Sequence, residues 1–264
     1  DTETAKLITI SVVLITRDAE RTVGRALDSV TGVAAEVIAV DSGSADRTPD
    51  ICREHGARVL HREWDGYGAQ KNFALSQAAC TWVLSLDADE ALSPALAREI
   101  AALDDSTPYN GFSFPRLNHY FGRPLRHGSQ FPDRQLRLFR RGSGRFNTRP
   151  VHESLQVEGR VGELDGVLEH YSYLTLDDYF EKFGRYTVLE AERLLASGMK
   201  PSAFGAALHM ILRPVFKFLR RYLLKGGFLD GIPGLLAALF NSMTMIVSYA
   251  RFWEKYQKDP SRKE

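Results

Sequence analysis

Two carboxylates stand one residue apart in the segment Asp87-Ala88-Asp89, directly after an apolar run, and Glu90 follows them. Carboxylates placed this closely repel one another unless a cation lies between them. Hard divalent cations such as Mg²⁺ and Mn²⁺ take oxygen ligands and commonly share them with a substrate phosphate. The segment therefore predicts a divalent metal site that neutralises a leaving diphosphate. A solvated acidic loop is the alternative interpretation.

The apolar runs along the first part of the chain must position these acids. Four of them are rich in Val, Ile and Leu and predict buried strands: residues 7–17, 36–40, 57–61 and 82–89. Helical patterns separate them at about 19–31, 47–55 and 68–79, and Ser93 before Pro94 predicts the start of another helix. Strands that alternate with helices in this way predict an α/β fold, with a mostly parallel sheet and helices on both faces.

Polar residues fall at the predicted ends of several strands. Ligands of open α/β sheets bind beyond the carboxyl ends of the strands, and Thr16, Asp41 and the Asp87–Asp89 segment all lie there. Asp41 is followed by Ser-Gly-Ser and could accept hydrogen bonds from a nucleobase or a ribose. A plain turn, with Asp46 capping the next helix, is the alternative. No Gly-x-Gly-x-x-Gly and no P-loop follows the first strand, which disfavours a dinucleotide site and excludes a P-loop enzyme.

The middle of the chain has a different pattern. Residues 111–170 hold short alternating segments broken by Gly and Pro, which predict a mixed, antiparallel-leaning β extension. Its Arg137, Arg140 and Arg141 could hold a diphosphate or an acceptor phosphate, and a solvated basic edge strand is an equally good interpretation. Because 34 Lys and Arg nearly balance 33 Asp and Glu, the composition implies no nucleic-acid partner.

The chain reads as helices from residue 176 onward. Within 203–224, apolar residues recur at steps of three and four with basic residues largely between them, which suits a helix lying in an anionic membrane interface. Pro214 should kink this helix. Residues 232–250 carry no charge, and their number is close to what a membrane span needs. A helix in the interface, or packed on its neighbour, is favoured over a span, and an ordinary soluble helical cap is the third interpretation.

Several ordered motifs resemble a known family. The segments ISVVLITRDAERTVGRALDSV, VIAVDSGSADRT, GYGAQKNFAL and WVLSLDADE resemble the inverting family 2 glycosyltransferases, which have the Rossmann-like GT-A fold. The segments FPDRQLRLFRR, VHESL, LEHYSY and KGGFLDG resemble the branch that includes lipopolysaccharide core β-1,4-glucosyltransferases. The resemblance implies transfer of a hexose, with glucose as the first expectation, from a UDP-sugar to a lipid-linked saccharide such as the lipopolysaccharide inner core.

The same resemblance implies a location and a division of the chain. The enzyme would work at the cytoplasmic face of the bacterial inner membrane, as a peripheral or monotopic protein on an anionic membrane surface. A GT-A catalytic domain is expected over residues 1–175, with the donor half at 7–105 and the acceptor half at 106–175. A membrane-associating helical region is expected over 176–264.

The resemblance also implies a role for each matching residue. Thr16 and Asp41 would contact the nucleoside, and Lys71 would lie near the base or the diphosphate. Asp87 would contact the ribose or sugar of the donor, and Asp89 would bind Mg²⁺ or Mn²⁺. Many relatives carry a second acid next to the position of Asp41, so nucleobase recognition is expected to differ in this chain.

Inversion requires one carboxylate base near the acceptor hydroxyl. Asp133 in FPDRQLRLF is the predicted base and Glu153 in VHESL is its rival, with a salt bridge to a nearby Arg as the alternative for either. His170 is the predicted additional metal ligand, with His152 close behind it and a structural imidazole as the alternative for each. Arg137 is assigned to the sugar-nucleotide donor.

Three other functions fit parts of the sequence. A nucleotidyltransferase would use a similar sheet and metal, but it should carry a Gly-rich loop where this chain has TRDAERT. A polyprenyl phosphate could replace the saccharide acceptor, although clear multiple membrane spans are absent from the sequence. A non-catalytic membrane-surface protein could also keep this fold.

Overall fold

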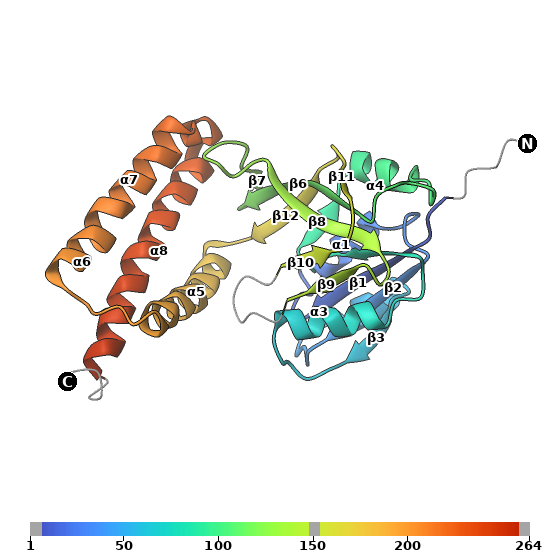
Figure 1. Ribbon diagram of the computed structural model, residues 1–264, viewed down its shortest axis with the longest axis horizontal. Coiled ribbons are helices and arrows are strands. Elements are labelled where there is room, and N and C mark those ends of the chain that lie inside the picture. Colours follow the sequence, from blue (N-terminus) through green and yellow to red (C-terminus); the bar gives the residue numbers. More distant parts are fainter. Residues whose placement is uncertain (1–6, 148–153, 259–264) are drawn as a thin grey trace, which may run out of the picture. The chain divides into compact units, whose positions relative to one another are not determined.

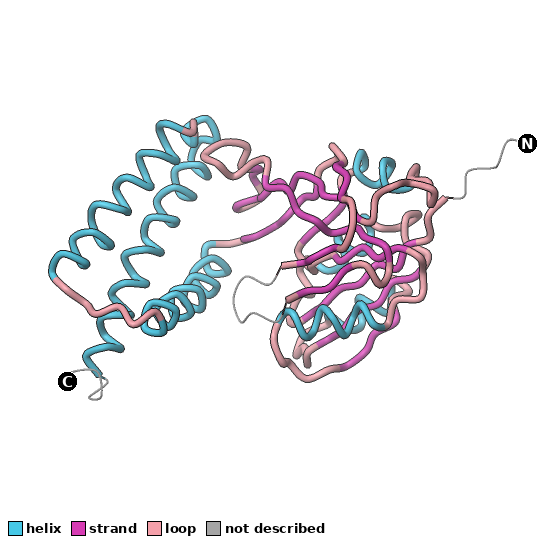
Figure 2. Tube along the Cα trace, viewed as in Figure 1, coloured by secondary structure: helices cyan, strands magenta, loops and turns pink. Residues whose placement is uncertain are grey.

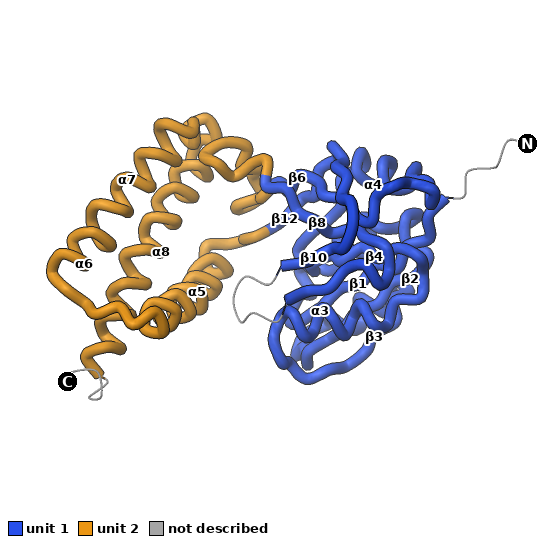
Figure 3. Tube along the Cα trace, viewed as in Figure 1, with its two compact units in different colours: residues 1–117, 133–171 blue, residues 118–132, 172–264 orange. Residues whose placement is uncertain are grey.

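The computed structural model describes residues 7–147 and 154–258. The chain divides into two compact units, residues 1–117 with 133–171 and residues 118–132 with 172–264 (Figure 3). The first, the sheet unit, contains most of the strands, and the second, the helical unit, contains the long C-terminal helices (Figures 1 and 2).

Four parallel strands form the first half of the sheet. They are β1 (Ile10–Thr16), β2 (Glu36–Asp41), β3 (Arg58–His61) and β4 (Trp82–Ser85), in the order β3-β2-β1-β4. The helices between and after them are α1 (Val23–Ser29), α2 (Thr48–Glu54), α3 (Tyr67–Ser76) and α4 (Pro94–Ala101). The Ser93 hydroxyl accepts the Leu96 N–H at 3.2 Å, which confirms the predicted helix start.

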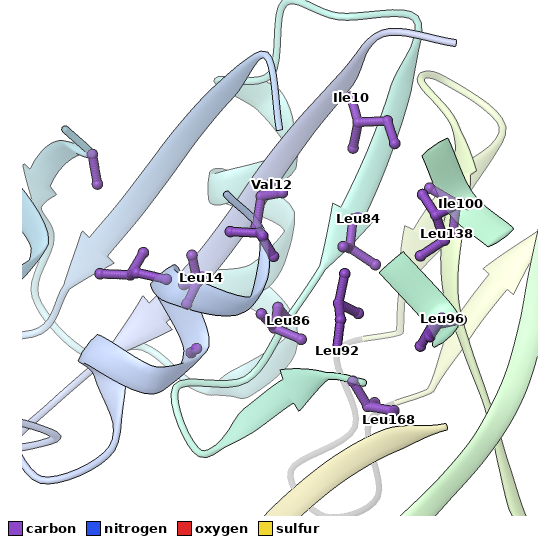
Figure 4. Close-up of a cluster of buried hydrophobic side chains, with 14 of the residues drawn as sticks. Ile10, Val12, Leu14, Leu84, Leu86, Leu92, Leu96, Ile100, Leu138 and Leu168 are labelled. Carbon is purple, nitrogen blue, oxygen red and sulfur yellow. The ribbon is translucent and has the colours of Figure 1, made fainter. Parts of the chain in front are cut away.

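Alternate residues of each strand point to opposite faces of the sheet, and both faces are covered. One core cluster packs β1 and β4 side chains against α1, α2 and α4 and also contains residues of β5, β8 and β12. Figure 4 shows part of this cluster. The other cluster contains Val13 and Val83 from the same strands and packs them against Ala74 of α3. The predicted parallel sheet with helices on both faces is therefore confirmed, and Trp82 lies fully buried within its core.

The second half of the sheet is mixed. Strand β8 (Asp133–Arg140) pairs antiparallel with β4 on one side and with β6 (Gly111–Tyr120) on the other, and β12 (Leu168–Tyr173) and β5 (Glu90–Leu92) complete the order. The short strands are β7 (Arg123–Pro124), β9 (Gly144–Phe146), β10 (Leu155–Val157) and β11 (Val161–Glu163). The predicted antiparallel extension is confirmed, but an edge position for β8 is wrong. Strands on both sides cover β8, and Leu138 and Phe139 in it are buried.

The helical unit is built on two long helices. They are α5 (Leu176–Ala196), which starts with a capping box between Thr175 and Asp178, and α8 (Gly231–Lys258). Between them lie α6 (Ala203–Ala207), η1 (Leu208–Leu212), α7 (Arg213–Leu219), η2 (Arg220–Leu224) and η3 (Gly227–Asp230). The elements η1 and η2 are π-helical turns on either side of α7. Since Pro214 lacks an N–H and its ring crowds the preceding turn, regular α-helical hydrogen bonding is interrupted there.

Residues 118–132 belong to the helical unit, whereas the expected catalytic domain over 1–175 included them. His127 donates from its backbone N–H to Asp230 at 2.8 Å, and its ring Nδ1 lies 2.7 Å from the other oxygen of the same carboxylate. Gly128 donates its N–H to the Lys225 carbonyl at 2.9 Å. These contacts join residues about a hundred positions apart, so no local sequence pattern could indicate them.

Candidate functional site

The predicted site residues that the structure describes gather around the carboxyl edge of the parallel strands. Thr16 and Asp41 end β1 and β2 as register partners, and the Thr16 hydroxyl donates to Asp41 at 3.0 Å. Helix α3 reaches two neighbouring loops, because Gln70 donates to the Ser42 hydroxyl at 2.8 Å and Lys71 pairs with Asp87 at 2.9 Å. The structure therefore gathers acids and cations from distant segments at one edge of the sheet.

The carboxylate of Asp41 shapes the loop that follows it. One oxygen accepts hydrogen bonds from the hydroxyls of Thr16 at 3.0 Å and Ser44 at 2.5 Å, and the other accepts the N–H groups of Gly43 and Ser44 at 3.0 and 2.9 Å. A carboxylate offers about four acceptor positions, so these bonds match its capacity. A direct bond from Asp41 to a nucleoside stays a prediction, and it would require one of these bonds to open.

Two protein cations compensate the charge of Asp87. Lys71 Nζ lies 2.9 Å from one carboxylate oxygen and Arg137 Nη2 lies 2.6 Å from the other, and both cationic side chains are more than nine-tenths buried. Burial by itself would raise the pKa of the Asp87 carboxyl, but the charges of Arg137 and Lys71 outweigh burial and hold this pKa well below its ordinary value. Repulsion between Asp87 and Asp89 therefore does not by itself demand a metal, and Asp87 stays ionised and fixed in orientation.

Glu90 is a residue of this site that sequence reasoning left without a role. Its side chain is fully buried and contacts two arginines, Arg137 at 2.7 Å and Arg116 at 3.4 Å. Its second oxygen accepts the Asp87 N–H at 3.1 Å. Glu90 directly precedes the apolar residues Ala91 and Leu92 in the sequence. Because a buried charge must be paired, this position could have indicated that Glu90 is buried and needs a cationic partner.

The predicted base Asp133 belongs to the same network. Arg116 donates from Nε and Nη2 to one Asp133 oxygen at 3.0 and 2.6 Å, and Gln135 donates to the other oxygen at 2.9 Å. The Asp133 side chain is 38% exposed, so it is anchored and still open to solvent. Glu90 and Arg116 thus connect the carboxylate assigned to the donor, Asp87, with the carboxylate assigned to the acceptor.

Asp89 and His170 face each other across the pairing of β5 with β12. The register places His170 opposite Glu90, and the Tyr171 N–H donates to the Asp89 carbonyl at 2.9 Å. The His170 Nε2 atom then lies 3.5 Å from an Asp89 carboxylate oxygen. One carboxylate and one imidazole so close together fit two ligands of a divalent cation. Among residues 7–147 and 154–258, no group of three or more His, Cys, Asp or Glu could hold a metal ion, so substrate phosphates and water would have to supply the other ligands.

The remaining predictions have separate outcomes. Glu153 and His152 lie outside the described residues. Arg140 donates to the Asp105 carboxylate at 3.0 Å and to backbone carbonyls, including that of Asp105 at 2.6 Å, so it holds a loop of the sheet unit. The assignments of individual residues to metal, donor and catalysis stay predictions.

A sheet with this strand order, whose carboxyl edge gathers such a set of acids, is the arrangement of the GT-A fold. The profile described as Glycosyl transferase family 2 matches residues 11–158, more than half of the chain. The chain therefore belongs to glycosyl transferase family 2, as the motif resemblance predicted.

Two relatives that match most of the chain are named as glycosyltransferases. The lipopolysaccharide core biosynthesis glycosyltransferase LpsC of Rhizobium meliloti is 30% identical over 257 residues, which cover 94% of this chain and 93% of the relative. An uncharacterized glycosyltransferase of Rickettsia typhi is 31% identical over 92% of this chain and 84% of its own length. Among solved structures, S. aureus TarS 1-349 in complex with UDP aligns over 95% of this chain and 92% of that chain, with 15% identity and a TM-score of 0.48.

Proposed function

We propose that this protein is an inverting hexosyltransferase that moves a sugar, with glucose as the first expectation, from a UDP-sugar to a lipid-linked saccharide such as the lipopolysaccharide inner core. The observation that carries the proposal is the Asp89–His170 pair at the carboxyl edge of the sheet, in which Asp89 follows the ion-paired Asp87 by two positions. The name of the relative LpsC supports the acceptor class.

The donor side of the site would work through fixed charges. Asp89 and His170 would hold Mg²⁺ or Mn²⁺, which when bound supplies positive charge that stabilises the leaving diphosphate. Lys71 and Arg137 hold the Asp87 carboxylate in one orientation, so that it can accept a hydroxyl of the donor ribose or sugar. Because these contacts exist before the donor binds, little reorganisation is needed during the reaction.

On the acceptor side, Asp133 would take the proton of the attacking hydroxyl. The acceptor oxygen forms a bond to the anomeric carbon while the bond from that carbon to the diphosphate breaks, and the electron pair leaves with the nucleotide. Attack from the face opposite the leaving group converts an α-linked donor into a β-linked product. Arg116 and Gln135 hold the Asp133 carboxylate in place for this step.

The donor and metal are tested together by thermal shift with a set of UDP- and GDP-sugars, with and without Mn²⁺. A ligand that binds only the folded protein raises its stability as ligand concentration rises, so we expect stabilisation by a UDP-sugar that increases with Mn²⁺. Asp89→Ala should lose the metal-dependent part, while the exposed Asp50→Ala should keep it. Equal Mn²⁺ dependence in Asp89→Ala and wild type would overturn the metal assignment.

The acceptor is tested by separate transfer reactions. A deacylated lipopolysaccharide core saccharide and a polyprenyl phosphate are offered with the UDP-sugar selected by the thermal shift. Transfer to the saccharide supports the proposal, and transfer to the polyprenyl phosphate alone supports the alternative acceptor. A lipid-linked acceptor would place the reaction at the cytoplasmic face of the bacterial inner membrane. Among the residues described, one helix, within Gly227–Lys258, is long and apolar enough to span a membrane.

A further inference from the structure

The helical unit has a large apolar surface that its own helices leave uncovered. On α6, η1, α7 and η2, eight large apolar side chains are 43% to 76% exposed. They are Phe204, Ile211, Leu212, Val215, Phe216, Leu219, Leu223 and Leu224. Phe228, Leu229 and Ile232 are exposed in the next turn of chain and at the start of α8. Soluble proteins rarely expose so many large apolar groups together, and such a surface marks an interaction site.

The charge of the same segment indicates which partner fits. Residues 197–229 contain no Asp or Glu, but they contain six Lys or Arg residues. Arg213, Arg220 and Lys225 are exposed among or beside the apolar side chains. Exposed Phe and Leu beside Lys and Arg match the interface of a membrane that carries anionic headgroups. An apolar protein groove would bind the apolar groups, but it would leave the excess positive charge unmatched.

Helix α8 is the alternative membrane element, because it makes up most of the helix Gly227–Lys258, which is long and apolar enough to span a membrane. However, α8 packs along α5 in the helical unit. The rings of Tyr179 and Phe240 stack at 4.1 Å, and Lys255 pairs with Glu192 at 2.6 Å. A span by α8 would therefore bring α5 into the bilayer or separate the two helices.

The composition of α5 makes that outcome costly. Eight of its residues are charged: Asp177, Asp178, Glu181, Lys182, Arg185, Glu190, Glu192 and Arg193. Charged side chains in the centre of a bilayer are strongly unfavourable. Separating α5 from α8 would instead expose the buried cluster of Ala191, Leu194, Tyr249 and Phe252. Both routes oppose a span by α8.

We propose that the surface formed by residues 204–224, continued by 228–232, embeds in one leaflet of an anionic membrane and that α8 does not cross the bilayer. The helices α6 and α7 would lie along the leaflet, with their apolar side chains among the acyl chains. Arg213, Arg220 and Lys225 would reach the headgroups. This arrangement makes the protein monotopic and specifies how it is held at the proposed membrane location. The proposal can be tested separately from the transfer reaction, because lipid binding is measured without a sugar donor.

Vesicle binding tests the embedded surface. The purified full chain is mixed with vesicles of phosphatidylcholine alone or of phosphatidylcholine with phosphatidylglycerol, and the bound fraction is measured by flotation. We expect stronger binding to the anionic vesicles, weakened by salt. The double variant Ile211→Glu with Phe216→Glu should bind at least about tenfold more weakly, because each large apolar side chain contributes about that factor when it leaves water.

A matched control separates this effect from a general effect of added acid. Val161→Glu makes the same type of change at an exposed site of the sheet unit and should bind vesicles as the wild type does. Because Ile211 and Phe216 are 60% and 65% exposed, their replacement should leave circular dichroism and Tm unchanged. Unchanged vesicle binding in the double variant, or wild-type failure to bind anionic vesicles, would overturn the proposal.

Labelling with a membrane-impermeant maleimide distinguishes a leaflet-bound helix from a span. Single-cysteine variants Glu63→Cys and Gln257→Cys are made in a Cys80→Ser background, since Cys52 is buried. In sealed inner-membrane vesicles, both positions should react from the same side. Reaction of Gln257→Cys from the side opposite to Glu63→Cys would show that α8 crosses the membrane and would refute the monotopic arrangement.

Discussion

Replacing Glu90 by Gln removes one negative charge from a fully buried side chain of the site. The Glu90 carboxylate accepts hydrogen bonds from Arg137 at 2.7 Å and from the Asp87 N–H at 3.1 Å, and Arg116 lies 3.4 Å away. An amide has nearly the same volume, but only one of its two terminal atoms accepts hydrogen bonds. After the exchange, either an arginine or the Asp87 N–H must face an NH₂ group, so stability and turnover should both fall.

The expected loss in the free energy of unfolding depends on the contacts that the two arginines keep in Glu90→Gln. Removing one partner from a buried ion pair costs about 3–5 kcal/mol. Arg137 keeps Asp87 at 2.6 Å and Arg116 keeps Asp133 at 2.6 Å, so the lower limit, about 3 kcal/mol, applies. For a chain of this size, such a loss lowers Tm by roughly 6–12 °C. A domain with about 5–15 kcal/mol of stability still folds with this change.

Thermal unfolding followed by circular dichroism measures this loss, with Glu63→Gln as the control. The Glu63 side chain is 93% exposed, so its exchange should change Tm by less than about 2 °C. In transfer assays, Glu90→Gln should lower kcat more than it raises KM for the UDP-sugar, because Glu90 fixes the two arginines and not the substrate. Equal Tm values for Glu90→Gln and Glu63→Gln would refute the buried-network reasoning.

Three further outcomes are expected. Asp133→Ala should keep UDP-sugar binding in the thermal shift but lose about 10²–10⁴-fold in transfer rate, and full activity would move the base to Glu153. The depressed pKa of Asp87 gives stability that is complete well above the unfolded carboxyl pKa of about 3.9, begins to be lost near about pH 5, and continues to be lost as pH falls toward the lower pKa of the folded state; Tm between pH 5 and 3 should therefore fall less steeply in Asp87→Asn, and parallel curves would contradict this. A Cβ at Gly234 would overlap the Gly227 carbonyl, so Gly234→Ala should lose about 1–3 kcal/mol, whereas Gly184→Ala meets nothing within 4 Å and should gain about 0.5–1 kcal/mol; Tm shifts of the same sign would count against this packing.

The parallel half of the sheet could be predicted from the sequence because its signals are local. Each strand is a continuous apolar run, and Ser93 with Pro94 marks a helix start by its own chemistry. The interior position of β8 could not be predicted in this way. Its pairing with β4 joins Trp82 to Arg140, and such long-range antiparallel pairing leaves no periodic pattern in either segment.

The candidate site was predictable in its residues but not in its pairings. Strand ends and family motifs indicated Asp87, Asp89, Lys71 and Arg137 together. The sequence could not show that Lys71 and Arg137 neutralise Asp87, because the three residues come from three separate elements. The role of Glu90 could not be predicted for the same reason, because its burial depends on arginines contributed by β6 and β8.

The position of β8 limits how this enzyme could be recombined with its relatives. A fragment that ended after the first hundred residues would leave the β4 edge open and would separate Asp87 and Glu90 from Arg137. Exchanging the front half of one relative for that of another should therefore fail unless β8 is transferred with it. The segments that form the network of Asp87, Glu90 and Arg137 are thus discontinuous along the chain, and hybrid proteins should be designed around β8.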